Sequence, residues 1–267
     1  MSPILELHDA ALAYGPRVLW SGLELGVAPG EFVAVLGANG SGKTSLLQAV
    51  LGLQPLSAGT VLVGGEPARR GSRLIGYVPQ QRRIDPLTPL RARDVVAQGV
   101  DGHRWGIGLP GRRDRVVDAA LAEVGASAYR DLPVGVLSGG EQQRVRMAQA
   151  LASDPRLLLC DEALLSLDLN SQAAITALVD RRRREHDTAI VFVTHEINPI
   201  LPYVDRVLYL AGGRFRIGSV DEVMTSETLS SLYGMPVEVL RTGGRILVAG
   251  APDLHVHAHE HDRAAAL

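Results

Sequence analysis

The residues with the clearest chemical potential form the run G-x-x-x-x-G-K-T, which spans residues 37–44. An apolar stretch at 31–36 precedes it as an expected buried strand, and apolar residues at helical spacing follow it. Such a loop points backbone N–H groups at phosphate oxygens, while its lysine reaches the β- and γ-phosphates and its threonine serves Mg²⁺. We therefore predict a nucleoside triphosphate site. Its expected contacts are Gly37, Ala38, Asn39, Gly40, Ser41, Gly42, Lys43, Thr44 and Ser45.

An acidic pair supplies the metal-holding group that such a loop requires. The apolar run Leu157–Cys160 is expected to be a buried strand, and it ends in Asp161 and Glu162. Asp161 is predicted to hold Mg²⁺ through water, and Glu162 to polarise the water that attacks the γ-phosphate. A helix N-cap is the alternative interpretation of the pair. Cys160 is predicted to be a small core residue.

Composition narrows the class of protein. The 267 residues carry a net charge of -2, which gives no electrostatic reason to expect a nucleic-acid partner. Lys43 is the one lysine among 27 basic residues. This indicates that position 43 requires the compact ammonium group of lysine and that the planar guanidinium group of arginine would not replace it. A single cysteine fits a reducing compartment, and no apolar stretch approaches the roughly 20 residues of a membrane span. We expect no signal peptide at the N-terminus.

Between the two motifs stands L-S-G-G-E-Q at Leu137–Gln142, which resembles the signature of ATP-binding-cassette (ABC) ATPases. The other motifs of that family occur in the order typical of it, some before and some after this signature. The resemblance covers about residues 3–225. It implies that Tyr14 stacks on adenine, that Gln80 contacts Mg²⁺ and the attacking water, and that His195 contacts the γ-phosphate. Asp168 matches the D-loop aspartate. Where a proline commonly follows the catalytic glutamate, this chain has Ala163, which leaves that turn less rigid.

The resemblance also implies a head-to-tail homodimer. Family members bind nucleotide between two chains, so the signature serine and glycines contact the partner's γ-phosphate with a hydroxyl and with N–H groups at a helix N-terminus. Hydrolysis then requires two chains, with Glu162 as general base and ATP and Mg²⁺ as ligands. The residues expected to contact the nucleotide of the other chain are Ser138, Gly139, Gly140, Gln142 and Asp168.

The chain is expected to fold as an α/β protein, a P-loop NTPase core with a RecA-like mixed sheet, an antiparallel β subdomain and an α-helical signature subdomain. We predict an ABC ATPase domain over 1–225, with the helical subdomain at about 84–152. A β-hairpin extension is predicted over 226–250, turning at Gly243–Gly244, and a disordered tail over 251–267. "GTVLVGGEP" predicts another hairpin. The arginine run at 181–184 is predicted to be a solvated helix face.

Three functions are open for such a cassette: an importer ATPase, an exporter ATPase, or a non-transport protein of translation or DNA repair. One cassette without heptads or a membrane span favours transport with separate subunits, and of the two transport functions we expect an importer ATPase on the cytoplasmic face of the membrane. Its partners would be permease subunits and, indirectly, a solute-binding protein. "YVPQQRRIDPLTPLRARDVVAQG" and "SLYGMPVEVL" resemble zinc and manganese importers. The cassettes of siderophore, haem and cobalamin importers have similar sequences at these positions, so these cargoes stay as alternatives.

Half of the chain's eight histidines alternate with other residues in the tail sequence "HVHAHEHD". A solvated tail without function is one interpretation. The other is a loose Zn²⁺ chelator, because neutral imidazoles suit zinc and a flexible segment can wrap one ion without a preset geometry. The residues concerned are His255, His257, His259 and His261.

Overall fold

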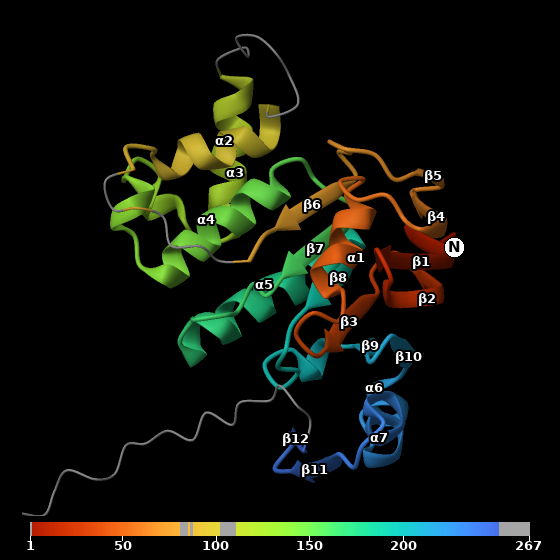
Figure 1. Ribbon diagram of the computed structural model, residues 1–267. Coiled ribbons are helices and arrows are strands. Elements are labelled where there is room, and N and C mark those ends of the chain that lie inside the picture. The colour runs from red at the N-terminus through yellow and green to blue at the C-terminus, as the bar shows by residue number, and fades with distance from the viewer. Residues whose placement is uncertain (1, 81–84, 86–87, 102–110, 251–267) are drawn as a thin grey trace, which may run out of the picture.

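The computed structural model describes residues 2–80, 85, 88–101 and 111–250 (Figure 1). Its centre is a six-stranded sheet in the order β10-β9-β3-β8-β7-β6, in which only β10 runs antiparallel to its neighbour. β3, β7 and β8 are buried on both faces, which explains their unbroken apolar sequences. The strands are β3 Phe32–Gly37, β6 Ile75–Val78, β7 Leu157–Asp161, β8 Ala189–Val193, β9 Arg206–Ala211 and β10 Arg214–Gly218.

Alternate residues of these strands face two different cores. Val33 and Val35 point toward the core that includes Trp20 and Leu47, whereas Phe32 and Ala34 face the larger core on the other side. The first core is closed by α1 and by a four-stranded antiparallel sheet in the order β2-β1-β4-β5, and its β4–β5 hairpin confirms the one predicted from "GTVLVGGEP". The elements are α1 Lys43–Val50, β1 Leu5–Tyr14, β2 Arg17–Val27, β4 Ala58–Val63 and β5 Glu66–Pro67.

The second core lies under the helices. α2, α3 and α4 pack against one another as a helical subdomain at one end of the molecule, while α5 continues along the central sheet (Figure 1). Their positions agree with the predicted helical region, and the glycine-rich interruption within it lies outside the described residues. Cys160 is fully buried in this core, as predicted. The helices are α2 Ala92–Asp101, α3 Arg112–Glu123, α4 Gly139–Leu151 and α5 Leu169–His186.

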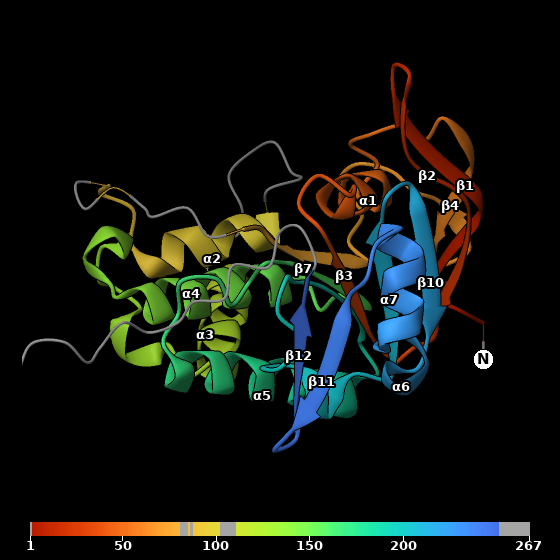
Figure 2. The ribbon, with the colours of Figure 1, turned by 60° about the horizontal axis from the view of Figure 1, so that its bottom comes forward.

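The C-terminal part begins with a helix, where a β-hairpin extension was predicted over 226–250. α7 is capped by Thr225, ends at Gly234 in a left-handed conformation, and places Leu229 and Leu232 in the larger core. The predicted hairpin follows it, turning at Gly243–Gly244, and lies beside α7 (Figure 2). The elements are α6 Val220–Val223, α7 Ser226–Tyr233, β11 Glu238–Thr242 and β12 Arg245–Ala249.

The arginine run on α5 is not the solvated face that was predicted. Arg184 is exposed, but the side chain of Arg182 is only 3% exposed. It pairs with Glu123 at the end of α3 and with Asp154 after α4, and its Nε donates to Thr188 Oγ1 at 3.1 Å. Helix α5 is therefore joined to the helical subdomain by a buried guanidinium.

Replacing Arg182 by alanine is expected to lower the free energy of unfolding by about 2 kcal/mol. This loss of stability is smaller than for a fully buried ion pair, because the Asp154 side chain is 81% exposed and is hydrated by water once Arg182 is removed. Arg184→Ala is the matched control and should cost about 0.5 kcal/mol or less, since its charge lies at the surface. Urea unfolding measures both, and equal losses would contradict a structural role specific to Arg182.

Candidate nucleotide-binding site

The phosphate loop joins the end of β3 to the start of α1. Gly37, Gly40 and Gly42 have φ values of 141°, 74° and 98°, a region that favours glycine. A Cβ at Gly37 would lie 2.0 Å from the carbonyl oxygen of Leu210, and one at Gly42 would lie 2.8 Å from Nε1 of Trp20. The glycines are thus required both by backbone conformation and by close packing. Gly42 is also the N-cap of α1, so the helix N-terminus faces the loop.

Lys43 lies over this loop. Its side chain is almost buried, and Nζ donates to the carbonyl oxygens of Gly37 at 2.7 Å and Ala38 at 2.9 Å. An ammonium group next to a glycine-rich loop and a helix N-terminus is suited to bind phosphate oxygens. The only lysine of the chain therefore lies in the loop where it was predicted to contact phosphate, and that contact stays a prediction.

A carboxylate and a hydroxyl meet beside the loop. Thr44 Oγ1 donates to Oδ1 of Asp161 at 3.4 Å, and the hydroxyl of Tyr77 donates to Oδ2 at 3.4 Å. Burial raises the pKa of Asp161, and burial together with this carboxylate raises the pKa of Tyr77 to about 12. Tyr77 was not singled out from the sequence; its strand, β6, pairs in parallel with β7 and so brings it to Asp161.

The predicted base and its neighbours form a second cluster. Gln80 Nε2 donates to Oε2 of Glu162 at 2.7 Å, and Nδ1 of His195 lies 3.9 Å from Oε1. The interaction with His195 holds the pKa of Glu162 below its usual range and raises the pKa of His195. Glu162 has a φ of 48°, a left-handed conformation that is strained for a non-glycine residue. Its backbone N–H donates to Val193 O at 2.9 Å, which fixes this turn against β8.

The signature serine and the D-loop aspartate cap two neighbouring helices. Ser138 is the N-cap of α4 in a capping box with Glu141, and Asp168 is the N-cap of α5. A Cβ at Gly140 would lie 2.6 Å from Ser171 Oγ, so the two helix N-termini are adjacent. The side chain of Gln142 turns inward instead, and its Nε2 donates to the carbonyl oxygen of Leu137 at 3.0 Å.

Tyr14 lies beside the first turn of α1. The residue is 48% exposed, and its hydroxyl is 3.3 Å from Ser45 Oγ and donates to Gln54 Oε1 at 3.1 Å. An aromatic ring is therefore held at the surface next to the first turn of α1. The remaining loop residues, Asn39 and Ser41, lie in the same loop between β3 and α1.

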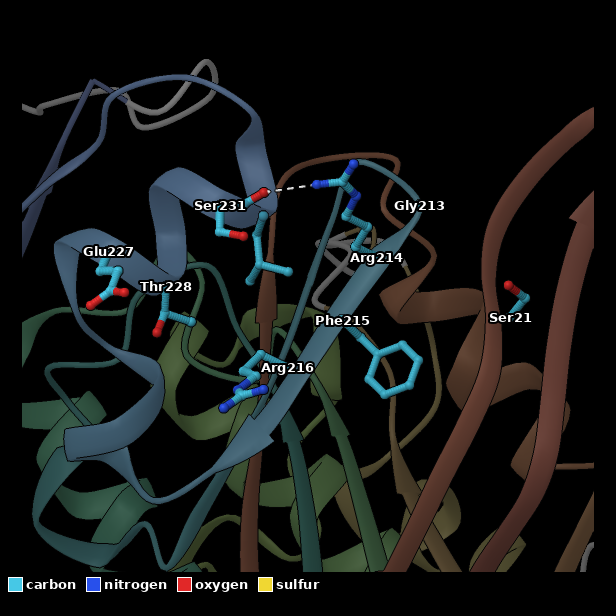
Figure 3. A pocket seen from close by; sticks show the side chains of 9 residues that line it. Ser21, Gly213, Arg214, Phe215, Arg216, Glu227, Thr228 and Ser231 are labelled. Carbon is cyan, nitrogen blue, oxygen red and sulfur yellow. Dashed lines mark hydrogen bonds between the residues drawn. The ribbon is translucent and has the colours of Figure 1, made fainter.

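One cleft of the structure lies away from this chemistry. A cleft of about 580 Å³ is lined by residues of β2, β10 and α7, where Arg214 donates to the carbonyl oxygen of Ser231 at 3.1 Å (Figure 3). The phosphate loop and Glu162 do not contribute to it. We place the site at the loop, because there the nearly buried ammonium, the glycines of positive φ and the carboxylates converge.

No cluster of three or more histidine, cysteine, aspartate and glutamate side chains suited to a metal occurs within the described ranges. The histidines at 255, 257, 259 and 261 lie outside those ranges, as does the whole predicted tail. Weak zinc binding by these residues therefore stays a prediction. In the part of the chain that the structure covers, no helix combines the length and apolar character needed to cross a membrane.

The fold and the phosphate loop define a P-loop nucleotide-binding protein. Residues 20–165 match the model of the ABC transporter family. The chain is 36% identical to the zinc transport system ATP-binding protein TroB of Treponema pallidum, over 86% of each protein. It is 31% identical to the zinc import ATP-binding protein ZnuC of Pseudomonas fluorescens, over 98% of this chain and 88% of that protein.

The similarity extends to a manganese system and to solved structures. The manganese transport system ATP-binding protein MntB of Halalkalibacterium halodurans is 34% identical over 87% of this chain and 93% of that protein. A chain of a structure described as a metal-chelate type ABC transporter in an inward-facing conformation superposes with a TM-score of 0.78, at 26% identity over 92% of this chain and 96% of that chain. This chain belongs to the ABC transporter family and is an ATP-binding ATPase of it, as the sequence motifs predicted.

Proposed function

We propose that the chain is the ATP-hydrolysing subunit of an importer that moves zinc or manganese through a separate membrane permease. The observation that carries the catalytic part is the convergence of the phosphate loop, Asp161, Glu162 and Gln80 at one edge of the central sheet. The cargo is supported by the relatives named above, which are zinc and manganese transport proteins. ATP would be bound between Tyr14 and the loop, with its phosphates on Lys43 and the N-terminus of α1.

The residues present fit Mg²⁺ beside the phosphates. Thr44 and Asp161 bring a hydroxyl and a carboxylate to within 3.4 Å of each other. Gln80, which donates to the neighbouring Glu162, would add its side-chain oxygen as a further ligand. Oxygen ligands of this kind are those that Mg²⁺ prefers. Bound there, the ion would neutralise charge on the phosphates. Glu162, kept ionised by His195 and Gln80, would take the proton of the attacking water, and His195 would hold the γ-phosphate.

A second copy of the chain would complete the site. Ser138 and Asp168 lie at adjacent helix N-termini, where hydroxyl and N–H groups can meet the nucleotide of a partner. We propose that they act there with Gly139 and Gly140, and that Gln142 supports them through its contact with Leu137. The homodimer would dock on permease subunits at the cytoplasmic face of the membrane, and a solute-binding protein would act on the other side.

Deleting the gene is expected to slow growth when zinc or manganese is chelated, because uptake would lose its source of energy. Added metal and a plasmid with the intact gene should both restore growth. A plasmid carrying Glu162→Gln is the matched control and should not. Unchanged growth of the deletion strain under both chelation regimes would reject metal import, and rescue by a siderophore, haem or cobalamin instead would identify the other cargo.

A further inference from the structure

The segment that carries His195 is fixed at both ends. We define the switch segment as residues 194–200, which follow β8. At its start, the backbone N–H of Thr194 donates to Val35 O at 3.1 Å, and Thr194 Oγ1 accepts from the N–H of Glu196 at 3.1 Å. At its end, Ile197 and Ile200 are buried in the larger core. The backbone on either side of His195 therefore depends on what packs against this segment.

Asn198 connects the switch segment to the C-terminal hairpin. Its Nδ2 donates to the carbonyl oxygen of Ile246 at 3.0 Å, and its Oδ1 accepts from the backbone N–H of Ile246 at 2.8 Å. The amide of Asn198 thus bonds both the N–H and the carbonyl oxygen of Ile246, the two backbone groups that a neighbouring strand would otherwise pair with. The side chain of Ile246 is buried in the same core as Ile197.

The other bonds of the hairpin start from β11. Val239 N–H donates to Ser226 Oγ at 2.9 Å, and Arg241 pairs with Asp221, which attaches β11 to α7 and to the start of α6. β11 and β12 pair in register with each other. Within the described residues, the amide of Asn198 thus joins β12 to the switch segment by two hydrogen bonds, beside the packing of Ile246 in the core, and a displacement of the hairpin would move the switch segment.

We propose that Asn198 is a positioning residue that ties the location of the β11–β12 hairpin to the alignment of His195 with Glu162. His195 is half exposed, and its Nδ1 lies 3.9 Å from Glu162 Oε1, a separation that small shifts of the backbone can shorten or lengthen. The inference rests on the proposed role of His195 in turnover. Misplacing a group by about 1 Å in such a site can cost a large factor in rate.

Asn198→Ala is expected to reduce kcat for ATP by about tenfold or more, while the KM for ATP changes by less than about twofold. The split is expected because the amide of Asn198 bonds Ile246 in β12, whereas Lys43 bonds the phosphate loop between β3 and α1. Asn198→Asp keeps the acceptor for the Ile246 N–H but loses the donor, so an intermediate kcat is expected. Leu247→Ala is the control, since Leu247 is an exposed residue of the same strand. The full-length chain is used throughout.

A second readout does not depend on turnover. The pKa of the His195 imidazole is measured by NMR titration, with His195→Ala used to assign its signal. A fall of this pKa in Asn198→Ala, toward the value of a free histidine, would show that the contact with Glu162 has loosened, whereas it should not change in Leu247→Ala. Thermal unfolding of each variant reports any general loss of stability.

The outcomes separate the two proposals. If His195→Ala is inactive and Asn198→Ala has the kcat and the His195 pKa of the natural chain, the link proposed for Asn198 is wrong and the proposed function stands. If His195→Ala retains full turnover, the role of His195 in the proposed function is wrong, and the titration still tests whether Asn198 controls its position. A rise in KM with kcat unchanged would also overturn the proposal.

Discussion

Replacing Glu162 by glutamine is expected to lower the rate of ATP hydrolysis by about 10²–10⁴-fold and to leave ATP binding intact. Gln80 donates to one oxygen of this carboxylate at 2.7 Å, and His195 faces the other. Both neighbours keep the pKa of the carboxyl low, so it is ionised at neutral pH and able to accept a proton. A glutamine has the same shape but no such capacity.

Phosphate release measures the loss of turnover, and binding of a fluorescent ATP analogue measures the affinity. The variant should also accumulate as an ATP-bound dimer in size-exclusion chromatography, because the step that separates the two chains is blocked. Glu196→Gln is the matched control: it removes an exposed carboxylate close to His195 without touching Glu162. Full hydrolysis by Glu162→Gln would reject the general-base assignment, whatever the control shows.

The sequence could predict that Thr44, Asp161 and His195 lie near one another because each of them follows or ends a strand. Thr44 lies at the start of α1, Asp161 ends β7 and His195 comes after β8, and parallel neighbours bring their carboxyl ends to one edge of the sheet. Motif order was therefore enough to bring these residues together. Tyr77 was missed because its contact with Asp161 depends on β6 being the neighbour of β7, which no local pattern in "LIGYVPQ" reveals.

Contacts between distant segments escaped prediction for the same reason. Asn198 and Ile246 are separated by 48 residues, and an asparagine after a strand looks like an ordinary turn residue. Arg182 stands in a run of arginines whose spacing suggested solvent, but burial of one member depends on where the end of α3 packs. Helix α7 was different: Thr225 and Gly234 are recognisable start and stop signals, so this helix was predictable from local sequence.

Replacing Gly37 by alanine is expected to abolish ATP binding and to lower the free energy of unfolding by about 3 kcal/mol or more. Two effects add. The φ of 141° is strained for any residue with a Cβ, and the new methyl carbon would lie 2.0 Å from the carbonyl oxygen of Leu210. Because Gly37 pairs with Leu210 across β3 and β9, relief of this clash must displace the strand that carries the phosphate loop.

A matched glycine separates the two effects. Gly65 has a φ of 81°, but a Cβ there would meet nothing within 4 Å, so Gly65→Ala retains the backbone strain without the clash. That variant should lose only about 1 kcal/mol and bind ATP normally, since the β4–β5 turn lies outside the phosphate loop. Urea unfolding and binding of a fluorescent ATP analogue measure both variants. Normal ATP affinity in Gly37→Ala would show that the loop tolerates a shift of β3, and the close packing of Gly37 against Leu210 would then not be what shapes the phosphate site.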